Sequence, residues 1–389
     1  MKGRPSHPIH AIALRSHSLP FRGRSYPGSL SRRKNPYSEG YSASKSTRRR
    51  RSPGHCDGKS HPVHICARIN PVCFERYSKY CKVSKAVENE IKGAFFFSPF
   101  GNFFEAKGKA FVIERKILDE MLLIKASEFA EVFVKTKVNF KGEKAIVGSR
   151  EIRPDFIIGA DGVYSEVARA FGFKRPRFYS AIQIEAKFEA MDENFVEIYL
   201  GRNYSEFFAY AIPIADTAKI GVIAKRNVLQ YLRNLIEKHP SVSKRIKGSV
   251  VELNSGLIPA NLVNFVKGKV ALIGDSAGMV KPYSGGGLFY LLIASEKLAE
   301  NFPNLEKYRS AFLKELGREI RLGEKLRRVY NLEDEELEAI VKALKSFEFS
   351  DIDMDRPSTL LRLKNVFKIF KLLLTNPSLA KLALKVLGD

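Results

Sequence analysis

The segment best suited to do chemistry is residues 270–288, VALIGDSAGMVKPYSGGGL. It reads as a short apolar strand, a Gly-Asp turn, a loop that contains a proline, and three glycines that open a helix. Glycine lets a ligand approach the backbone closely, and the N–H groups at a helix start attract an anionic or dipolar ligand. Asp275, at the end of the strand, suits a ribose-like hydroxyl better than a phosphate, because like charges repel. A purely structural turn is the alternative interpretation of this pattern.

A second unit of the same kind lies upstream, at residues 156–172, FIIGADGVYSEVARAFG. An apolar run leads into a glycine-rich turn that contains Asp161, and a short helix follows. Ser165 is expected to cap the start of that helix, and Gly172 to end it. We interpret Asp161 first as a turn former and second as a group close to a cofactor.

The two units, separated by strand-like sequence at 181–224, resemble the flavoprotein hydroxylase superfamily, in which such segments serve FAD. Within it the chain is most similar to the geranylgeranyl reductase family. Residues 111–119 (FVIERKILD) and 207–222 (FFAYAIPIADTAKIGV) match further family segments, and the resemblance covers about residues 86–389. It implies an FAD-dependent oxidoreductase that saturates isoprenoid double bonds, such as those of geranylgeranyl (phospho)lipids of archaeal membranes, with hydride from flavin N5.

The resemblance also implies which residues would bind the cofactor. Gly287 and Leu288 would lie at the isoalloxazine ring, and Asp275 at the ribityl or phosphate-linker region. Arg115 would contact FAD, and Val138 would hold the adenine side through its backbone. From the pattern alone, Arg115 is equally well explained as a surface arginine at a helix start and Val138 as ordinary strand core.

The segment of the resemblance that lines a prenyl tunnel in the family contains Phe207, Phe208, Tyr210 and Pro213. Aromatic and aliphatic walls suit an isoprenoid because they exclude water at little desolvation cost. A hydrophobic sheet face packed against the cofactor domain is the alternative. Reduction of an isolated double bond also needs a proton donor, for which Tyr210 qualifies by its chemistry only, so the catalytic residue stays unassigned.

The net charge of +24 is concentrated in the N-terminal segment. Residues 1–80 hold 17 Lys and Arg against 3 Asp and Glu, which places +14 there, and all cysteines lie before residue 82. Residues 1–82 contain no G-x-G-x-x-G turn, with which a flavoprotein of this superfamily begins. The apolar residues of 1–80 are few and unpatterned, so this segment is predicted to lack a stable core or to pack only irregularly.

Three interpretations of this segment remain open. It is a basic tail for nucleic acid or anionic lipid, a zinc module, or a stretch read in a shifted frame. The zinc reading rests on His55, Cys56, His61, His64, Cys66 and Cys73, whose spacing lacks matched pairs. We favour the frame shift, because the composition is patternless and family-like sequence resumes near Val83. No nucleic-acid partner and no metal site are therefore expected.

The elements that must position these residues give the fold class. We predict an α/β protein with an incomplete Rossmann-like FAD-binding domain of the glutathione-reductase type, an inserted antiparallel substrate sheet and a helical C-terminal region. The expected boundaries are 83–175 and 267–303 for the FAD domain, 176–266 for the sheet and 304–389 for the helices, after the non-matching segment 1–82. Residues 131–138 are predicted to be a strand.

At the C-terminus, residues 360–374 carry basic residues beside a broad apolar stripe. Such a helix lies on an anionic membrane surface or covers the substrate tunnel as a lid. The expected partners are a prenyl lipid and an electron donor, either NAD(P)H or ferredoxin, and the expected location is the cytoplasm, peripheral at the membrane. The rival functions are a flavin-dependent monooxygenase and a truncated, non-functional flavoprotein.

Overall fold

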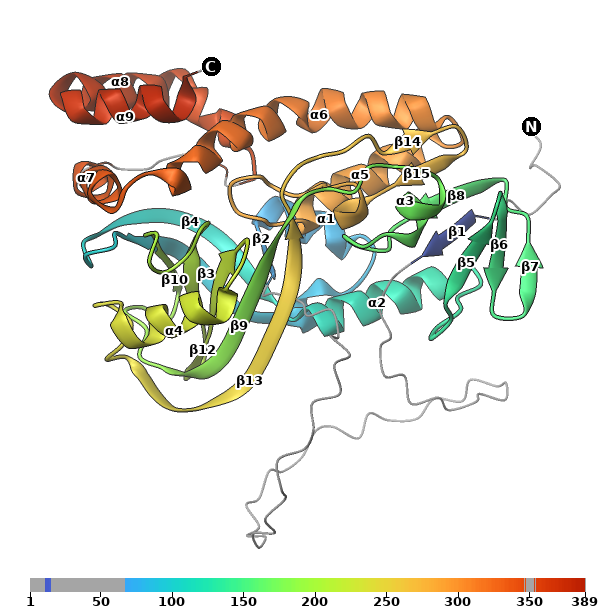
Figure 1. The fold of residues 1–389 in the computed structure, drawn as a ribbon, viewed down its shortest axis with the longest axis horizontal. Helices are drawn as coiled ribbons and strands as arrows, with labels where there is room; N and C mark the ends of the chain where they lie inside the picture. Colours follow the sequence, from blue (N-terminus) through green and yellow to red (C-terminus); the bar gives the residue numbers. More distant parts are fainter. Residues whose placement is uncertain (1–10, 15–66, 346, 348–352, 354, 389) are drawn as a thin grey trace, which may run out of the picture.

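The strands of this computed structural model form three sheets within the described residues, which are 11–14, 67–345, 347, 353 and 355–388 (Figure 1). A four-stranded sheet and a larger eight-stranded sheet lie beside each other, and a small three-stranded sheet stands at one end of the molecule. The two parts of the predicted FAD domain come together in the four-stranded sheet.

The four-stranded sheet has the order β1-β8-β15-β14. Strands β1 (Ala11–Leu14), β8 (Phe156–Gly159) and β15 (Val270–Leu272) run parallel, and β14 (Val266–Lys267) closes the edge in the antiparallel direction. The apolar residues of β8 and β15 are buried except for the half-buried Phe156, as expected for parallel strands. The ends of β8 and β15 carry the two glycine-rich turns, so the sheet brings both turns to one edge.

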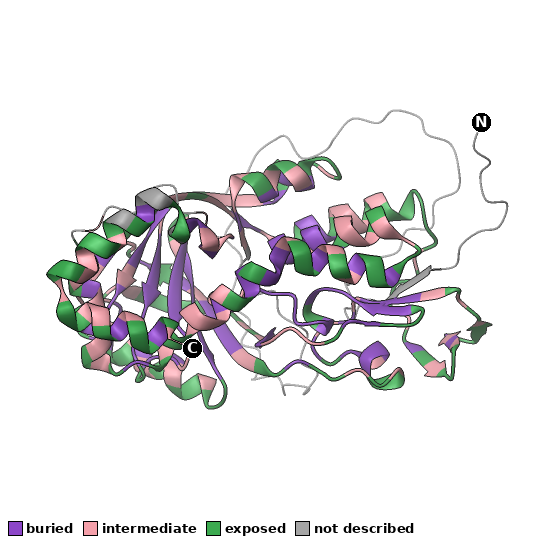
Figure 2. Cartoon of the chain, turned by 90° about the horizontal axis from the view of Figure 1, so that it is seen from above, coloured by how far each residue is buried: buried purple, intermediate pink, exposed green. Residues whose placement is uncertain are grey.

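The eight-stranded sheet has the order β13-β9-β12-β11-β10-β3-β4-β2. Its strands are β2 (Ala67–Ile69), β3 (Val87–Phe97), β4 (Phe103–Ile113), β9 (Phe178–Phe188), β10 (Phe195–Tyr199), β11 (Ala209–Ile214), β12 (Thr217–Ala224) and β13 (Ile246–Pro259). All neighbours are antiparallel except β10 and β3, which run parallel. Both faces are covered, so most of its central strands are buried (Figure 2). The small sheet consists of β5 (Val138–Lys141), β6 (Lys144–Val147) and β7 (Arg150–Ile152).

Helices cover each sheet in a defined way. Helices α1 (Pro71–Ser78), α2 (Arg115–Ser127), α5 (Leu288–Asn301) and α6 (Leu305–Leu326) belong to the core around the four-stranded sheet, with α3 (Glu166–Ala170) directly after β8. Helix α4 (Val228–Lys238) packs on one face of the large sheet, and α7 (Asp334–Leu344) with α9 (Pro377–Leu387) on the other. Helix α8 (Leu363–Thr375) lies against α9, and the short turns η1 (Val83–Ala86), η2 (Gly274–Ser276), η3 (Arg327–Asn331) and η4 (Pro357–Leu361) complete the chain.

The expectation for residues 1–80 is wrong for the part that the structure describes. Residues 67–78 form β2 and α1, and Cys73 and Tyr77 are buried in the core with Ile69. Helix α1 begins as its sequence dictates, because Pro71 stands at its first position and the Asn70 side chain accepts a hydrogen bond from the Cys73 N–H at 2.7 Å. Averaging charge over eighty residues hid this short amphipathic segment.

Two further expectations differ from the structure. Residues 131–137 form no strand, and β5 begins only at Val138, because Lys135 has a left-handed backbone (φ 56°) that breaks the extended run. Strands β3 and β4 lie within the predicted FAD segment 83–175 but pair in the eight-stranded sheet, where β3 runs beside β10. The eight-stranded sheet therefore contains strands that precede β8 in the sequence and strands that follow it.

Candidate functional site

The two glycine-rich turns lie in direct contact. The Ile273 N–H donates to the Gly159 carbonyl at 2.9 Å, and the Ser276 hydroxyl donates to the same carbonyl at 2.7 Å. Both contacts follow from the parallel pairing of β8 and β15, which ends at Gly159 and Leu272. The expectation that the two motifs form one site therefore holds for their backbones.

The turn after β15 depends on glycine at one position in particular. Gly278 has φ 76°, and a Cβ there would overlap the carbonyl of Asn261. No other residue type combines this backbone with so close an approach. The chain can therefore fold back tightly after Asp275 and present the loop that leads to α5.

Helix α5 begins at the predicted place, with Gly287 as its N-cap and no side chain capping its first N–H groups. A Cβ on Gly287 would lie 3.5 Å from the Asp275 carboxylate, so the carboxylate and the helix start are neighbours. Leu288 is buried, and its carbonyl accepts a hydrogen bond from the Tyr77 hydroxyl at 3.0 Å. A carboxylate beside uncapped helix N–H groups can bind a ligand that carries both hydroxyls and negative charge.

Arg115 stands at the first position of α2 and acts on this carboxylate. Asp275 is exposed, yet protein crowds it closely enough that desolvation raises the pKa of its carboxyl, while the Arg115 charge lowers that pKa. The Arg115 guanidinium donates to both oxygens of Asp119 at 3.3 Å. Its Nε is buried and has no hydrogen-bond partner among the described residues. The Nε–H of Arg115 is therefore open to a bound group.

Asp161 serves the fold directly. One carboxylate oxygen accepts the N–H groups of Glu166 at 2.7 Å and Val167 at 3.1 Å, and Ser165 caps the same helix by accepting from Ala168 at 2.8 Å. These contacts agree with the turn-forming role and with the predicted N-cap. The other oxygen, Oδ1, is buried without a hydrogen-bond partner among the described residues. Together with the Nε of Arg115, it is a buried polar atom of the candidate site that has no partner among the described residues.

Val138 begins β5, which contacts α3. It packs with Ala145 and Val147 in the small core of the three-stranded sheet. The neighbouring Phe140 ring meets Phe171, which follows α3, at a centroid distance of 5.1 Å. Ordinary strand core therefore describes its contacts, and its backbone role toward a cofactor stays a prediction.

The predicted substrate residues Phe207 and Phe208 belong to a buried aromatic cluster. Phe207 stacks on Tyr179 at 5.2 Å between ring centroids and meets Tyr330 edge-on at 4.7 Å. A Cβ on Gly285 would lie 3.9 Å from the Phe207 ring, so this cluster touches the loop that leads into α5. The sequence analysis missed Tyr179 of β9 and Tyr330 of η3. Both are far from Phe207 in sequence, and neither segment carries a motif that would connect it to Phe207.

Tyr210 and Pro213 are also buried, but they differ from the phenylalanines in their surroundings. The Tyr210 hydroxyl donates to the Gln183 side chain at 3.0 Å, deep in the sheet. Pro213 lies three residues further along β11, where its carbonyl accepts from Asn89 at 3.0 Å. Phe207 lies next to the α5 loop, and Phe208 and Tyr210 continue the same buried cluster with their ring centroids 6.2 Å apart, so a common wall for a prenyl chain stays a prediction.

A buried ion pair that the sequence analysis also missed holds the α5 loop. The Lys281 ammonium contacts the Asp355 carboxylate at 2.5 Å, and both side chains are largely buried. Gly286 leaves room for Lys281, since a Cβ there would lie 2.7 Å from its Cε. The Lys281 N–H also donates to the Gly286 carbonyl at 3.0 Å, so one lysine clamps the loop to the C-terminal region.

Cys73 is next to this pair and has a thiol pKa raised by burial. Of the six residue positions considered for zinc, it alone lies within the described part of the chain, where it is a free, fully buried thiol. No group of metal ligands occurs among the described residues.

Comparisons with known proteins point to one family, although no family model matches the chain. An uncharacterized protein from Methanocaldococcus jannaschii is 29% identical over 311 residues, which are 71% of this chain and 79% of that relative. Digeranylgeranylglycerophospholipid reductases from the same organism and from Methanococcus vannielii are each 27% identical, over 74% and 77% of this chain and 83% and 82% of theirs. The chain is thus similar to named members of the geranylgeranyl reductase family.

The solved structures agree on the fold of this chain. A geranylgeranyl bacteriochlorophyll reductase-like protein from Thermoplasma acidophilum superposes with a TM-score of 0.67 at 20% identity, covering 80% of this chain and 89% of that one. The flavin-dependent brominase Bmp2 reaches a TM-score of 0.52 at 15% identity. The predicted fold class, a Rossmann-type flavoprotein fold with an added sheet and C-terminal helices, is confirmed.

Proposed function

We propose that this chain is a member of the geranylgeranyl reductase family and an FAD-dependent oxidoreductase that saturates isoprenoid double bonds of a geranylgeranyl (phospho)lipid. The observation that carries the proposal is the contact between the aromatic cluster around Phe207 and the loop that opens α5. It puts an apolar wall beside the helix start and the Asp275 carboxylate. In this proposal, one loop serves both the cofactor and the apolar chain. The names of the relatives in the methanogens support this substrate class.

The residues present fit the flavin half of FAD. Bound FAD would supply the hydride. Asp275 would accept a hydrogen bond from a hydroxyl of the ribityl chain. The Nε–H of Arg115, which has no partner among the described residues, would donate a hydrogen bond to an anionic part of the cofactor. Gly287 and Leu288 would hold the ring edge where negative charge collects, through the uncapped N–H groups of α5. The open Oδ1 of Asp161 and the backbone of Val138 are assigned to the more distant parts of FAD by family resemblance alone.

The residues present do not fit the pyrophosphate half equally well. Residues 1–82 contain no G-x-G-x-x-G turn, and the described strand β1 marks the place beside β8 where such a turn would begin. Two or three N–H contacts to a charged group are then missing, each worth on the order of 1.5–3 kcal/mol. We therefore expect FAD to bind at least roughly a hundredfold more weakly than it would to a chain with this turn, and the chain as written to be inactive without excess FAD.

The function is tested with the full chain, saturating FAD, a chemical reductant and digeranylgeranylglycerophospholipid. Mass spectrometry should show products heavier by two hydrogens per saturated bond. Asp275→Ala should lower FAD affinity, and Lys174→Glu, an exposed surface change, serves as the control. A hydroxylated product formed from oxygen and NAD(P)H would instead identify a monooxygenase. A stoichiometric yellow protein, purified without added FAD, would contradict the expected weak binding.

A lipid substrate also implies a route from the bilayer, so contact with a membrane surface through residues 360–374 is part of the proposal. Reducing equivalents would come from NAD(P)H or ferredoxin. Product formation with one donor and not with the other decides between them. No described helix has the length and apolar character required to cross a bilayer.

A further inference from the structure

Helices α8 and α9 expose apolar side chains that a water-facing helix pair does not need. On α8, Val366, Phe370 and Leu374 follow one another at four-residue spacing, and Phe370 and Leu374 are 60% and 67% exposed. On α9, Leu384 is 72% exposed. Residues at this spacing lie on one face of a helix. Within the described residues, then, α8 presents an apolar stripe to the outside.

The packing of α8 and α9 distinguishes between two roles for α8, a membrane-facing helix and a lid over the substrate site. Leu382 and Val386 of α9 are buried in the core on the large sheet, so α9 is the helix that covers the sheet. Helix α8 packs on α9 and η4, which places it one layer further out. The stripe of α8 therefore faces away from the sheet that a lid would close.

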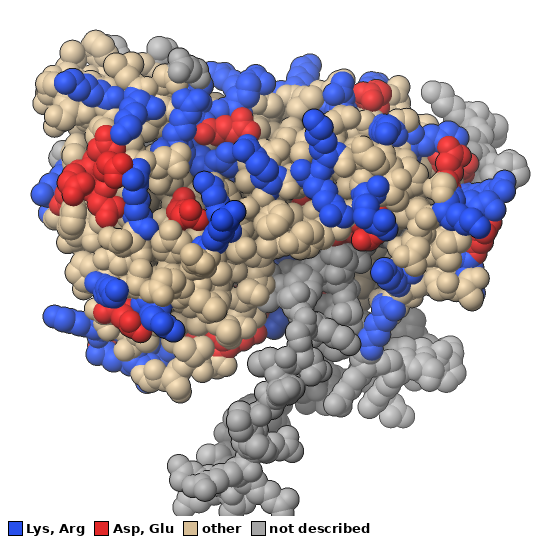
Figure 3. Space-filling model, viewed as in Figure 1, with Lys and Arg blue, Asp and Glu red and all other residues tan. Residues whose placement is uncertain are grey.

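The charge of this region has one sign. From residue 356 to residue 388 the sequence contains seven cations and no Asp or Glu. In the view of Figure 3, the acidic side chains on that side gather over α7, and the upper region of α8 and α9 shows only cationic and uncharged residues. Lys371 stands one turn from Leu374, and Lys381 one turn from Leu384, and both lysines are exposed. Apolar side chains flanked by cations complement an anionic lipid surface.

We propose that the face formed by Val366, Phe370, Leu374 and Leu384 with Lys371 and Lys381 docks on a bilayer that carries anionic headgroups. Helix α8 has 13 residues, about 20 Å, so it lies in the interface and does not span the hydrocarbon core. The docking face would be the surface through which a lipid substrate reaches the protein. Its biological purpose therefore rests on the proposed function.

The test is sedimentation of the full chain with vesicles at low salt. The chain should bind vesicles of phosphatidylcholine with phosphatidylglycerol and bind pure phosphatidylcholine more weakly. Phe370→Asp/Leu374→Asp should weaken binding at least about tenfold, because two inserted apolar groups become charged. Phe129→Asp is the matched control, since Phe129 is 80% exposed but follows α2, and it should bind as the unchanged chain does.

The charge contribution is tested separately. Lys371→Glu/Lys381→Glu should lose binding to the anionic vesicles by about tenfold or more, whereas Lys174→Glu/Lys187→Glu, elsewhere on the surface, should not. If circular dichroism shows that the double Asp variant is unfolded, Phe370→Ser/Leu374→Ser replaces it. Equal binding to both vesicle types, unchanged binding by the α8 variant, or a dimer that the same variant dissociates in place of vesicle binding would each overturn the proposal.

Vesicle binding is measured without turnover of a substrate. The docking face and the proposed function can therefore be refuted independently of each other. Binding without reduction of the lipid would refute the proposed function and leave the docking face in place. Reduction of detergent-dispersed lipid without vesicle binding would refute the docking face alone.

Discussion

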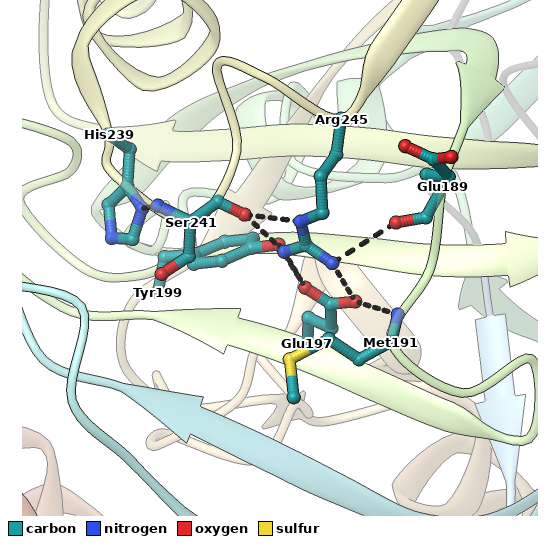
Figure 4. Close-up of polar contacts among 7 residues, drawn as sticks. All are labelled: Glu189, Met191, Glu197, Tyr199, His239, Ser241 and Arg245. Atoms are coloured by element: carbon teal, nitrogen blue, oxygen red, sulfur yellow. Dashed lines mark hydrogen bonds and ion pairs between the residues drawn. The ribbon is translucent and has the colours of Figure 1, made fainter.

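The clearest pH prediction concerns His239, which follows α4 on the face of the large sheet opposite α7 and α9. His239 is fully buried, and its Nδ1 accepts the Ser241 N–H at 3.1 Å (Figure 4). Rings of Phe97, Tyr199 and Tyr204 surround it. An imidazole enclosed in this way is stable only in its neutral form.

Burial lowers the pKa of His239 from 6.5 to about 4, with the nearby Arg245 charge adding to the shift and the Ser98 backbone opposing it. Between these two pH values the unfolded chain binds a proton that the folded chain does not. Stability from this group is therefore present in full above pH 6.5 and is lost as the pH falls toward about 4. A difference of 2.5 pKa units corresponds to about 3 kcal/mol.

The assay is urea unfolding of the unchanged chain and of His239→Gln at several pH values. Glutamine can accept the Ser241 N–H but does not titrate. The variant loses packing and is less stable at neutral pH, yet its stability should fall by about 3 kcal/mol less than that of the unchanged chain between neutral pH and pH 4. Carboxylates that titrate in this range, such as Glu315 and Glu336 with their lowered pKa values, affect both proteins and cancel in the difference.

Parallel pH profiles for the two proteins would refute the reasoning, because they would mean that His239 is protonated equally in the folded and unfolded chain. NMR titration of the His239 imidazole, which belongs to the one histidine among the described residues, gives an independent reading. A pKa near 6.5 in the folded state would contradict the buried, neutral assignment.

Three further predictions concern the sheet and the α5 loop. Gly221→Ala should destabilise the protein by roughly 1–3 kcal/mol in urea unfolding, because a Cβ would overlap the buried Tyr210 ring, whereas Gly108→Ala, with open space around it, should be nearly neutral. Lys281→Met should cost about 3–5 kcal/mol by leaving Asp355 buried and unpaired, and adding Asp355→Leu should restore much of that loss. Glu197→Gln should be destabilising in the same assay, since Glu197 is fully buried against the Arg245 guanidinium.

The parts of the fold that depend on local pattern could be predicted from the sequence. The start of α5 at Gly287, the cap at Ser165 and the turn at Gly172 (φ 67°) all follow from residues close to each other in the chain. The start of β5 could not be predicted, because the apolar run before Val138 has strand propensity and only the left-handed backbone at Lys135 interrupts it. Nor could the parallel pairing of β3 with β10, which joins segments about a hundred residues apart.

The same distinction holds for the candidate site. The resemblance placed Asp275, Gly287 and Leu288 together, and these residues are also neighbours in sequence. Arg115 reaches Asp275 only through the tertiary fold, and its effect on the carboxyl pKa is visible only in the structure. Tyr330 and Asp355 come from the C-terminal region and carry no motif, so periodicity could not connect them to Phe207 or Lys281.

The N-terminal segment shows most clearly what composition can hide. Its few and unpatterned apolar residues predicted no stable core or only irregular packing for residues 1–80, yet Asn70 and Pro71 start a helix whose Cys73 and Tyr77 are buried beside α5. Tyr77 even donates to the carbonyl of Leu288, at the predicted flavin edge. The described sequence is therefore continuous from residue 67, and before it the structure describes only β1 (Ala11–Leu14). A frame change sought in the gene belongs upstream of codon 67, where a G-x-G-x-x-G turn in another frame would explain both the basic composition and the expected weak FAD binding.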